Sequence, residues 1–266
     1  MSDMSEGLCS CCGEPLERVR YFPRQLLTAD DMGAEQEYLR EKARRHNRFL
    51  HGWGVVCGCT VETVTTAKTP TVRVCPGYAV APQGDEICID QCVDVDLQTG
   101  PQDQPCAVQW PCPPMGGVPT VNSDGFATVY VAVRYAECYA RPVRVHPAGC
   151  GCDETGCEYS RVRDSFEIKV LWQLPDSYVN AKNDEIAWCS TIKQVAGTLG
   201  GTHTYPVPPC PPCESDPWVV LATVMFYTGT DTKILSNPAK SLTISFTDRR
   251  VLLPTQRLQT AVLCFA

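Results

Sequence analysis

The stretch from residue 21 to residue 54 constrains the fold most, because it carries both a start signal and a stop signal for a helix. Thr28 is the predicted N-cap, and Asp31 occupies the capping-box position three residues later. Basic residues near the other end favour the negative end of the helix dipole. Gly52 and Gly54 then supply the flexible backbone that ends a helix. The stretch therefore predicts one long helix of roughly 22 residues.

A heptad-like seam runs along this predicted helix. Its members are spaced alternately by four and three residues: Met32, Gln36, Leu39, Ala43, His46 and Leu50. The seam is either the core-facing side of an amphipathic helix or the contact line of an oligomer. Three heptads lie at the lower limit for a coiled coil, so the pattern leaves both readings open. We take the six positions as candidate oligomerisation or docking residues.

Length and charge bound the class of protein. The 266 residues suffice for one or two domains with a sizeable core. A net charge of −7 argues against general nucleic-acid binding, which needs an excess of Lys and Arg. We find no apolar run of about 18 residues and no apolar segment in the acidic N-terminus. We therefore expect no membrane span, and synthesis in the cytoplasm without a signal peptide, either to stay there or to leave as part of a released particle.

Cysteine is the anomaly in the composition. The chain has 18 cysteines, several times the ordinary usage. Without a secretory signal, cytosolic reductants favour free thiols or metal thiolates at the time of synthesis. In a particle released from the cell, disulfides could form later.

Two C-x-x-C pairs suggest a metal site. Cys9 and Cys12, followed by Gly13, have the form of a zinc knuckle, which supplies two of the four ligands that structural zinc takes. Cys210 and Cys213 form the second pair and would complete the site. Disulfides or free buried thiols are the alternatives for these residues. Apart from this possible structural zinc, we expect no cofactor.

The rest of the chain predicts a mainly β protein with one long N-terminal helix and antiparallel β domains joined by loops rich in Pro and Gly. Residues 1–20 form a Cys-rich arm that precedes the helical stretch 21–54. Residues 55–98 alternate with a period of two and predict a small β domain. Residues 99–125 lack periodicity and predict a linker. Residues 126–266 predict a second β domain.

Within the second β domain, four runs of alternating or β-branched residues predict strands, and one weak helical pattern interrupts them. The strands are expected at residues 126–145, 165–174, 218–227 and 242–246, and the helix at 181–195. A strand and a short helix after Pro254 are expected at the C-terminus.

Many cysteines fall on these strands or in the loops between them, where cross-strand or local pairs could bond. The disulfide candidates are Cys57, Cys59, Cys75, Cys88, Cys92, Cys106, Cys112, Cys138, Cys150, Cys152 and Cys157. Those of the first β domain could equally be small buried hydrophobes. The loop from Cys150 to Cys157 is the densest group, and it suggests disulfides that involve Cys138, with a metal as the alternative.

The sequence carries no motif of a known catalytic class. It has no G-x-S-x-G elbow, no H-E-x-x-H, no P-loop and no Gly-rich nucleotide fingerprint. Only four histidines are present: His46, His51, His146 and His203. The Cys-Pro-Pro-Cys segment lacks the βαβ setting of a redox dithiol. We therefore expect that the protein is not an enzyme.

A set of short segments forms a pattern across most of the chain. In the helical stretch they are Tyr21-Phe22, Gln25-Leu26-Leu27-Thr28, Asp30-Asp31, Glu35-Gln36, Tyr38, His46-Asn47-Arg48 and the run from Leu50 to Gly58. Later ones are Val74, Pro76-Gly77-Tyr78-Ala79, Arg134-Tyr135, Glu137, Ser160 to Asp164, Phe166-Glu167 and Arg249-Arg250-Val251.

This pattern resembles structural proteins associated with phage tails and contractile injection systems, of the kind encoded near baseplate components. The resemblance implies a particle subunit and not a catalyst. It further implies a helix that docks on or trimerises with neighbouring subunits, and β domains that decorate or project. The thiol content departs from the family pattern, since Cys59 stands where a leucine would be more usual.

Three functions follow from these observations. The first is a structural subunit of a phage-tail-like or other large assembly, with homo-oligomers and other particle subunits as partners. The second is an adhesin-like module that binds a cell surface or glycan through stacking residues such as Trp110, Trp188 and Trp218. The third is a metal-thiolate (zinc) protein. The first explains most of the sequence, and we predict it.

Overall fold

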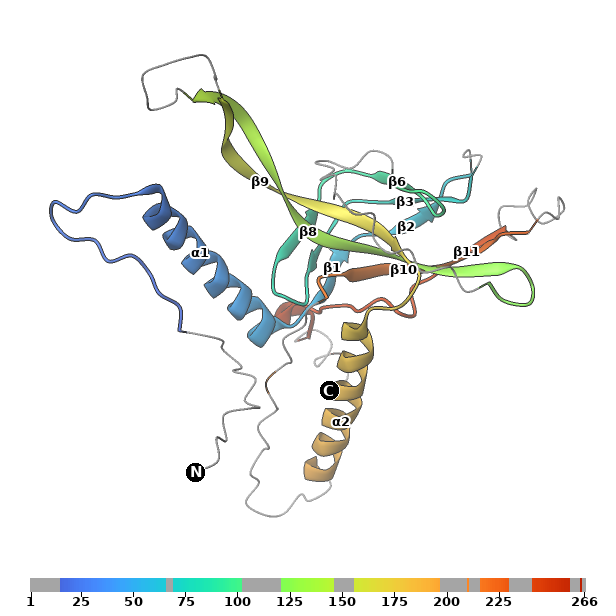
Figure 1. The fold of residues 1–266 in the computed structure, drawn as a ribbon. Helices are drawn as coiled ribbons and strands as arrows, with labels where there is room; N and C mark the ends of the chain where they lie inside the picture. The colour runs from blue at the N-terminus through green and yellow to red at the C-terminus, as the bar shows by residue number, and fades with distance from the viewer. Residues whose placement is uncertain are drawn as a thin grey trace, which may run out of the picture.

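The computed structural model describes residues 15–65, 69–101, 121–145, 156–196, 210, 216–229, 241–258 and 264. In this part of the chain three antiparallel sheets form the body, and two helices project from it (Figure 1). The prediction of a mainly β protein with antiparallel strands is confirmed.

The first two sheets interleave in sequence. Strands β1 (Gly54–Gly58), β4 (Gly77–Val80) and β5 (Glu86–Ile89) form one sheet in the order β1-β4-β5. The other has the order β2-β3-β6-β7, and its strands are β2 (Val61–Thr63), β3 (Thr71–Val74), β6 (Val93–Asp96) and β7 (Gly100–Pro101). The β4–β5 hairpin is therefore inserted between two paired strands, β3 and β6, of the other sheet.

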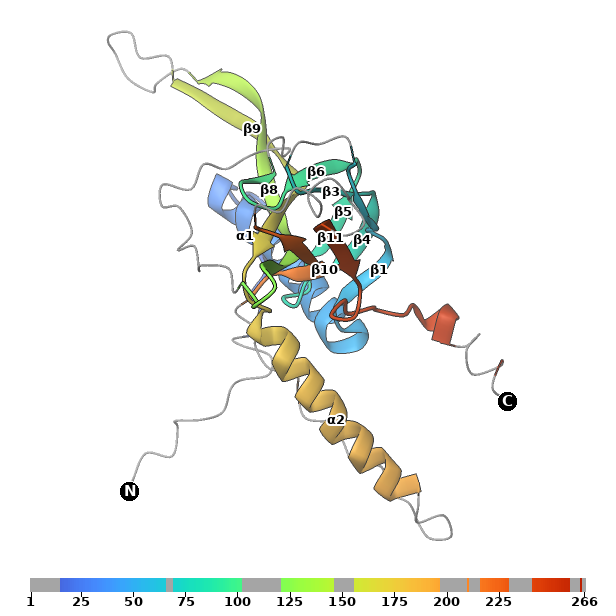
Figure 2. The same cartoon turned by 90° about the vertical axis from the view of Figure 1, so that its right-hand side faces the viewer.

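The third sheet has the order β11-β10-β8-β9. Its strands are β8 (Phe126–Val145), β9 (Gly156–Leu171), β10 (Val219–Tyr227) and β11 (Leu242–Ser245). Strand β9 pairs with β8 from Gly156, opposite Val145, to Leu171, opposite Tyr130, and the two strands extend from the body as a two-stranded ribbon (Figures 1 and 2). Strand β9 begins at Gly156, earlier than the predicted residue 165.

One hydrophobic cluster joins residues of all three sheets. It contains Val72 and Val95 from the first half of the chain together with Val131 and Leu221 from the second. A register shift between Val220 and Ala222 lets consecutive residues of β10, Leu221 and Ala222, both reach this cluster. The two predicted β domains thus share a common core.

The predicted helical stretch contains α1 (Ala29–His46), which continues as a five-residue π-helical turn, η1 (Asn47–His51). Gly52 follows with a φ of 81°, the positive value that favours glycine at a helix end. The stop signal at Gly52 is therefore confirmed. No residue of α1 is buried, so the helix lies against the body without entering the core.

The second helix, α2 (Asp176–Ala196), includes the predicted range and starts earlier. It points away from the body in both views (Figures 1 and 2). Its base packs against the body through a cluster that includes Tyr178, Trp53 and Val220. No helix in the described ranges is long and apolar enough to cross a membrane.

Candidate functional site: the exposed face of helix α1

The start of α1 is built by the predicted capping box. The backbone N–H of Asp31 donates to Thr28 Oγ1 at 3.1 Å, and the backbone N–H of Thr28 donates to Asp31 Oδ2 at 2.9 Å. These hydrogen bonds from the backbone and hydroxyl of Thr28 hold the pKa of the Asp31 carboxyl below its usual value. The first turn is thus fixed by local chemistry, as the sequence predicts.

The last turns of α1 are attached to the tight turn between β4 and β5. Arg44 Nε donates to Asp85 Oδ1 at 2.6 Å, and Asn47 Nδ2 donates to the carbonyl oxygen of Gly84 at 2.9 Å. The Asp85 side chain is 9% exposed, so this ion pair is largely shielded from water. Gly84 has a φ of 97°, and a Cβ there would lie 2.3 Å from the carbonyl oxygen of Arg44. The helix and the turn therefore touch backbone to backbone.

A second polar contact joins the middle of α1 to the β8–β9 ribbon. Arg40 forms an ion pair with Glu137 of β8. The hydroxyl of Tyr135 donates to Glu137 at 3.0 Å and to Asp164 of β9 at 2.8 Å. Burial, followed by these two carboxylates, raises the pKa of Tyr135. The helix is thus anchored to the body by ion pairs and hydrogen bonds and not by apolar packing.

The predicted seam lies entirely on the exposed side of α1 and η1. All six positions, Met32, Gln36, Leu39, Ala43, His46 and Leu50, are exposed. The three largest apolar side chains keep 50% (Met32), 59% (Leu39) and 70% (Leu50) of their surface accessible. In the single chain, therefore, the seam does not face the core.

More apolar surface is exposed just before the helix. Phe22 is 60% exposed and Leu26 is 86% exposed, although both are large hydrophobic residues. Desolvation and the nearby Glu35 of α1 raise the pKa of Tyr21 from the same segment. Large apolar side chains that a monomer leaves in water are candidates for contact with another protein.

The predicted zinc ligands are only partly described. Cys210 is an exposed free thiol, whereas Cys9, Cys12 and Cys213 lie outside the described residues. Within the ranges that the structure covers, no group of three or more His, Cys, Asp or Glu side chains could hold a metal ion.

The disulfide candidates fall into three groups. Cys57, Cys59, Cys75, Cys88 and Cys92 are free thiols, so the structure does not show the cross-strand disulfides expected in the first β unit. Cys138 of β8 is disulfide-bonded. Cys106, Cys112, Cys150 and Cys152 lie outside the described residues, and of Cys157 only the backbone is described.

Geometry explains why two of the exposed thiols stay free. Cys57 of β1 and Cys88 of β5 both pair with Tyr78 of the strand between them. Two strand spacings separate them, about 9 to 10 Å, whereas a disulfide needs Cα atoms about 4.4 to 6.8 Å apart. Cys59 is fully buried in the main cluster, as the alternative of a small hydrophobe predicted.

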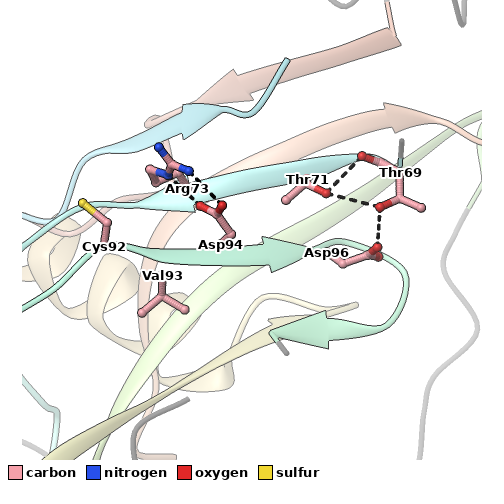
Figure 3. Close-up of a pocket in the computed structure, with 7 residues that line it drawn as sticks. All are labelled: Thr69, Thr71, Arg73, Cys92, Val93, Asp94 and Asp96. Carbon is pink, nitrogen blue, oxygen red and sulfur yellow. Dashed lines mark hydrogen bonds and ion pairs between the residues drawn. The ribbon is translucent and has the colours of Figure 1, made fainter. Parts of the chain in front are cut away.

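A surface pocket of about 430 Å³ lies on the outer face of the β3–β6 pair (Figure 3). Its lining comprises Thr69, Thr71, Arg73, Cys92, Val93, Asp94 and Asp96. Arg73 donates to both carboxylate oxygens of Asp94, at 2.6 and 2.8 Å, and Thr69 donates to Asp96 at 2.5 Å. The charged groups of the pocket are thus paired with groups of the pocket itself.

The tryptophans proposed for stacking do not form a common surface among the described residues. The guanidinium of Arg134 lies 5.0 Å from the ring centre of Trp218, and the Lys169 ammonium lies 5.7 Å from it. Trp188 is half-buried on α2, and Trp110 is outside the described residues. The ring of Trp218 therefore already has cationic partners.

Sequence reasoning missed the residues that anchor α1. Arg40 and Arg44 are four residues apart, each with a Glu three residues earlier, and their helical positions lie away from the seam. That spacing is the one sequence signal for these anchoring residues, because their partners Glu137 and Asp85 are too far along the chain to be recognised from the sequence. The resemblance pattern did include Arg249, whose guanidinium donates to the carbonyl oxygens of Leu221 and Cys59, each at 2.6 Å.

Comparison with known proteins adds no assignment. No protein-family model matches the sequence, and no curated protein matches it significantly. The function is therefore argued from the geometry of α1 and from the sequence pattern.

Proposed function

We propose that this protein is a structural subunit of a large assembly of the phage-tail-like type, and that it docks on neighbouring subunits through the exposed seam of α1. The observation that carries the proposal is the direction of the seam. Six positions with heptad-like spacing lie on one face, and in the single chain that face is directed to water.

The way in which α1 is anchored supports this role. Ion pairs and one side-chain amide, about a quarter turn around the helix from the seam, fix α1 to the β4–β5 turn and to the β8–β9 ribbon. A partner can therefore cover the apolar positions of the seam without displacing these anchoring contacts. Exposed Leu and Met side chains at these positions would be removed from water in the assembly, each contributing about 1.5 to 3 kcal/mol if fully buried.

The projecting elements suit an assembly subunit better than a catalyst. Helix α2 and the β8–β9 ribbon both extend from a small core (Figures 1 and 2). The described pocket has paired charges and no convergent set of catalytic groups. The resemblance to phage-tail and contractile-injection-system proteins supports the same proposal.

The test is the native mass of the purified protein, measured by sedimentation over a wide concentration range. Reductant and chelator are present, so that neither disulfides nor metal can hold the particles together. We expect a defined oligomer for the wild-type chain. Leu39→Glu places a charge in the seam and is expected to shift the protein toward monomer.

Ala34→Glu is the matched control. Ala34 is also exposed on α1, but it lies on the side opposite the seam, so the same charge there should leave the oligomer unchanged. A wild-type chain that stays monomeric at every concentration, and that never copurifies with other particle subunits, would refute the proposal. Equal dissociation of both variants would refute the role of the seam.

A further inference from the structure

Cys75 and Cys92 stand opposite each other at the base of the β4–β5 hairpin. Val74, the last residue of β3, pairs with Val93, the first residue of β6. Cys75 follows Val74 and Cys92 precedes Val93, so the same antiparallel register places these two cysteines opposite each other. The pKa of Cys92 responds to the Cys75 thiol, which makes the two side chains neighbours. Cys92 is exposed and Cys75 is half-buried.

The backbone around this pair has the geometry that a disulfide needs. The N–H of Cys75 donates to the carbonyl oxygen of Thr60 at 2.8 Å, so its backbone groups point toward β2. Cys75 and Cys92 are therefore a non-hydrogen-bonded pair of the β3–β6 ladder. Such pairs have Cα atoms about 4.5 Å apart, within the range of about 4.4 to 6.8 Å found in disulfides.

The pair lies on the outer face of the sheet. Figure 3 shows Cys92 and Asp94 on one side of β6 and Val93 on the other, where the core is. Partial desolvation and the neighbouring Cys75 thiol raise the pKa of Cys92, while Arg73 has the opposite effect. A small reagent can thus reach Cys92 from solvent without opening the fold.

The other free thiols of the first two sheets do not combine these features. Cys57 and Cys88 are separated by the strand that carries Tyr78. Cys59 has no exposed surface. The strand register therefore identifies Cys75 and Cys92 as a pair, whereas the sequence alone leaves the pairing of these cysteines undecided.

We propose that Cys75 and Cys92 are a modification site at which a low-molecular-weight disulfide, such as oxidised glutathione, converts a dithiol into an intramolecular disulfide. Cys92 displaces one thiol from the reagent and forms a mixed disulfide. The sulfur of Cys75 then attacks the sulfur of Cys92, and the second thiol leaves. Two protein thiols are oxidised, one reagent disulfide is reduced to two thiols, and these carry the two protons.

The bond would close an 18-residue loop that contains β4 and β5. These strands belong to the sheet of β1, so the disulfide would join the ends of β3 and β6 at the point where the chain leaves their sheet for the other. The turn of the same hairpin also anchors α1 through Asp85. We expect oxidation to raise the thermal midpoint by roughly 5 to 10 °C.

The experiment uses the full-length reduced protein, incubated with oxidised glutathione, quenched with acid and alkylated. A protease that cleaves at acidic residues separates Cys75, Cys88 and Cys92 into three peptides, because Asp85, Glu86 and Asp90 lie between them. Mass spectrometry is expected to find the Cys75 and Cys92 peptides joined as the main product, together with the rise in thermal midpoint.

Cys92→Ser is expected to abolish both the cross-link and the rise, and its exposure makes the substitution compatible with folding. Cys88→Ser removes another exposed thiol of the same hairpin and should leave both results unchanged. A stable glutathione adduct on Cys92 without closure would overturn the proposal. So would a main product that joins Cys92 to a cysteine other than Cys75.

Discussion

A buried hydrogen bond contributes to the attachment of α2. The N–H of Val220 donates to the hydroxyl of Tyr178 at 2.6 Å, next to the register shift of β10. Tyr178 is 8% exposed, and its ring meets Trp53 edge to face with centroids 4.8 Å apart. Tyr178→Phe keeps the ring and removes only the oxygen, so the buried N–H loses its acceptor.

The expected cost follows from that loss. A buried donor left without a partner destabilises a protein by about 1 to 3 kcal/mol, whereas an exposed hydroxyl contributes almost nothing. Urea denaturation of Tyr178→Phe should therefore show a lower midpoint with an unchanged m-value. Hydrogen exchange adds a local measurement, because the amide of Val220 should exchange faster in the variant.

Tyr139→Phe provides the matched control, since Tyr139 is 75% exposed on the β8–β9 ribbon. Its free energy of unfolding should stay within about 0.5 kcal/mol of the wild type. If Tyr178→Phe is equally silent and the exchange of Val220 does not change, the hydrogen bond does not hold the base of α2, and the reasoning is wrong.

Three further substitutions test the anchor, the core and the cap. In urea denaturation, Gly84→Ala should destabilise the protein more than Gly100→Ala. Both positions have positive φ, but only a Cβ at residue 84 would meet the helix backbone, at 2.3 Å. Equal effects of the two substitutions would contradict the close contact. Burial raises the pKa of Cys59 from 9.0 to about 11, so the unfolded chain ionises first and stability is lost as the pH rises above 9. At pH 11 the free energy of unfolding of the wild type should have fallen by roughly 2 to 3 kcal/mol more than that of Cys59→Ala, with both measured under reductant. Parallel pH profiles of the two proteins would contradict this effect of Cys59. Thr28→Ala should lower the stability of α1 by about 1 kcal/mol, measured as faster exchange of the first-turn amides, with no effect on β10; unchanged exchange would argue against the cap.

Chemistry between residues near in sequence was predictable. Thr28 and Asp31 satisfy each other across three residues, and Gly52 supplies a positive φ, so both ends of the helical stretch follow from local hydrogen bonding and backbone freedom. Two-residue alternation likewise predicted most strands, because it reports which side of a strand is apolar. These signals need no knowledge of the partner strand.

The tertiary structure decided what those elements face. The first half of β9 is an exposed ribbon with polar residues, so it carries no alternation from which a strand could be predicted. The seam of α1 has the same spacing whether it faces a core or a partner, and contacts with distant residues, among them the ion pairs of Arg40 and Arg44, leave it exposed to water. The facing of Cys75 and Cys92 depends on the β4–β5 hairpin inserted between β3 and β6. Residue types over a few neighbouring positions determined the helices and strands. Contacts between residues far apart in sequence determined which surfaces these helices and strands face, because the free energy of such a contact depends on groups that only the folded chain brings together.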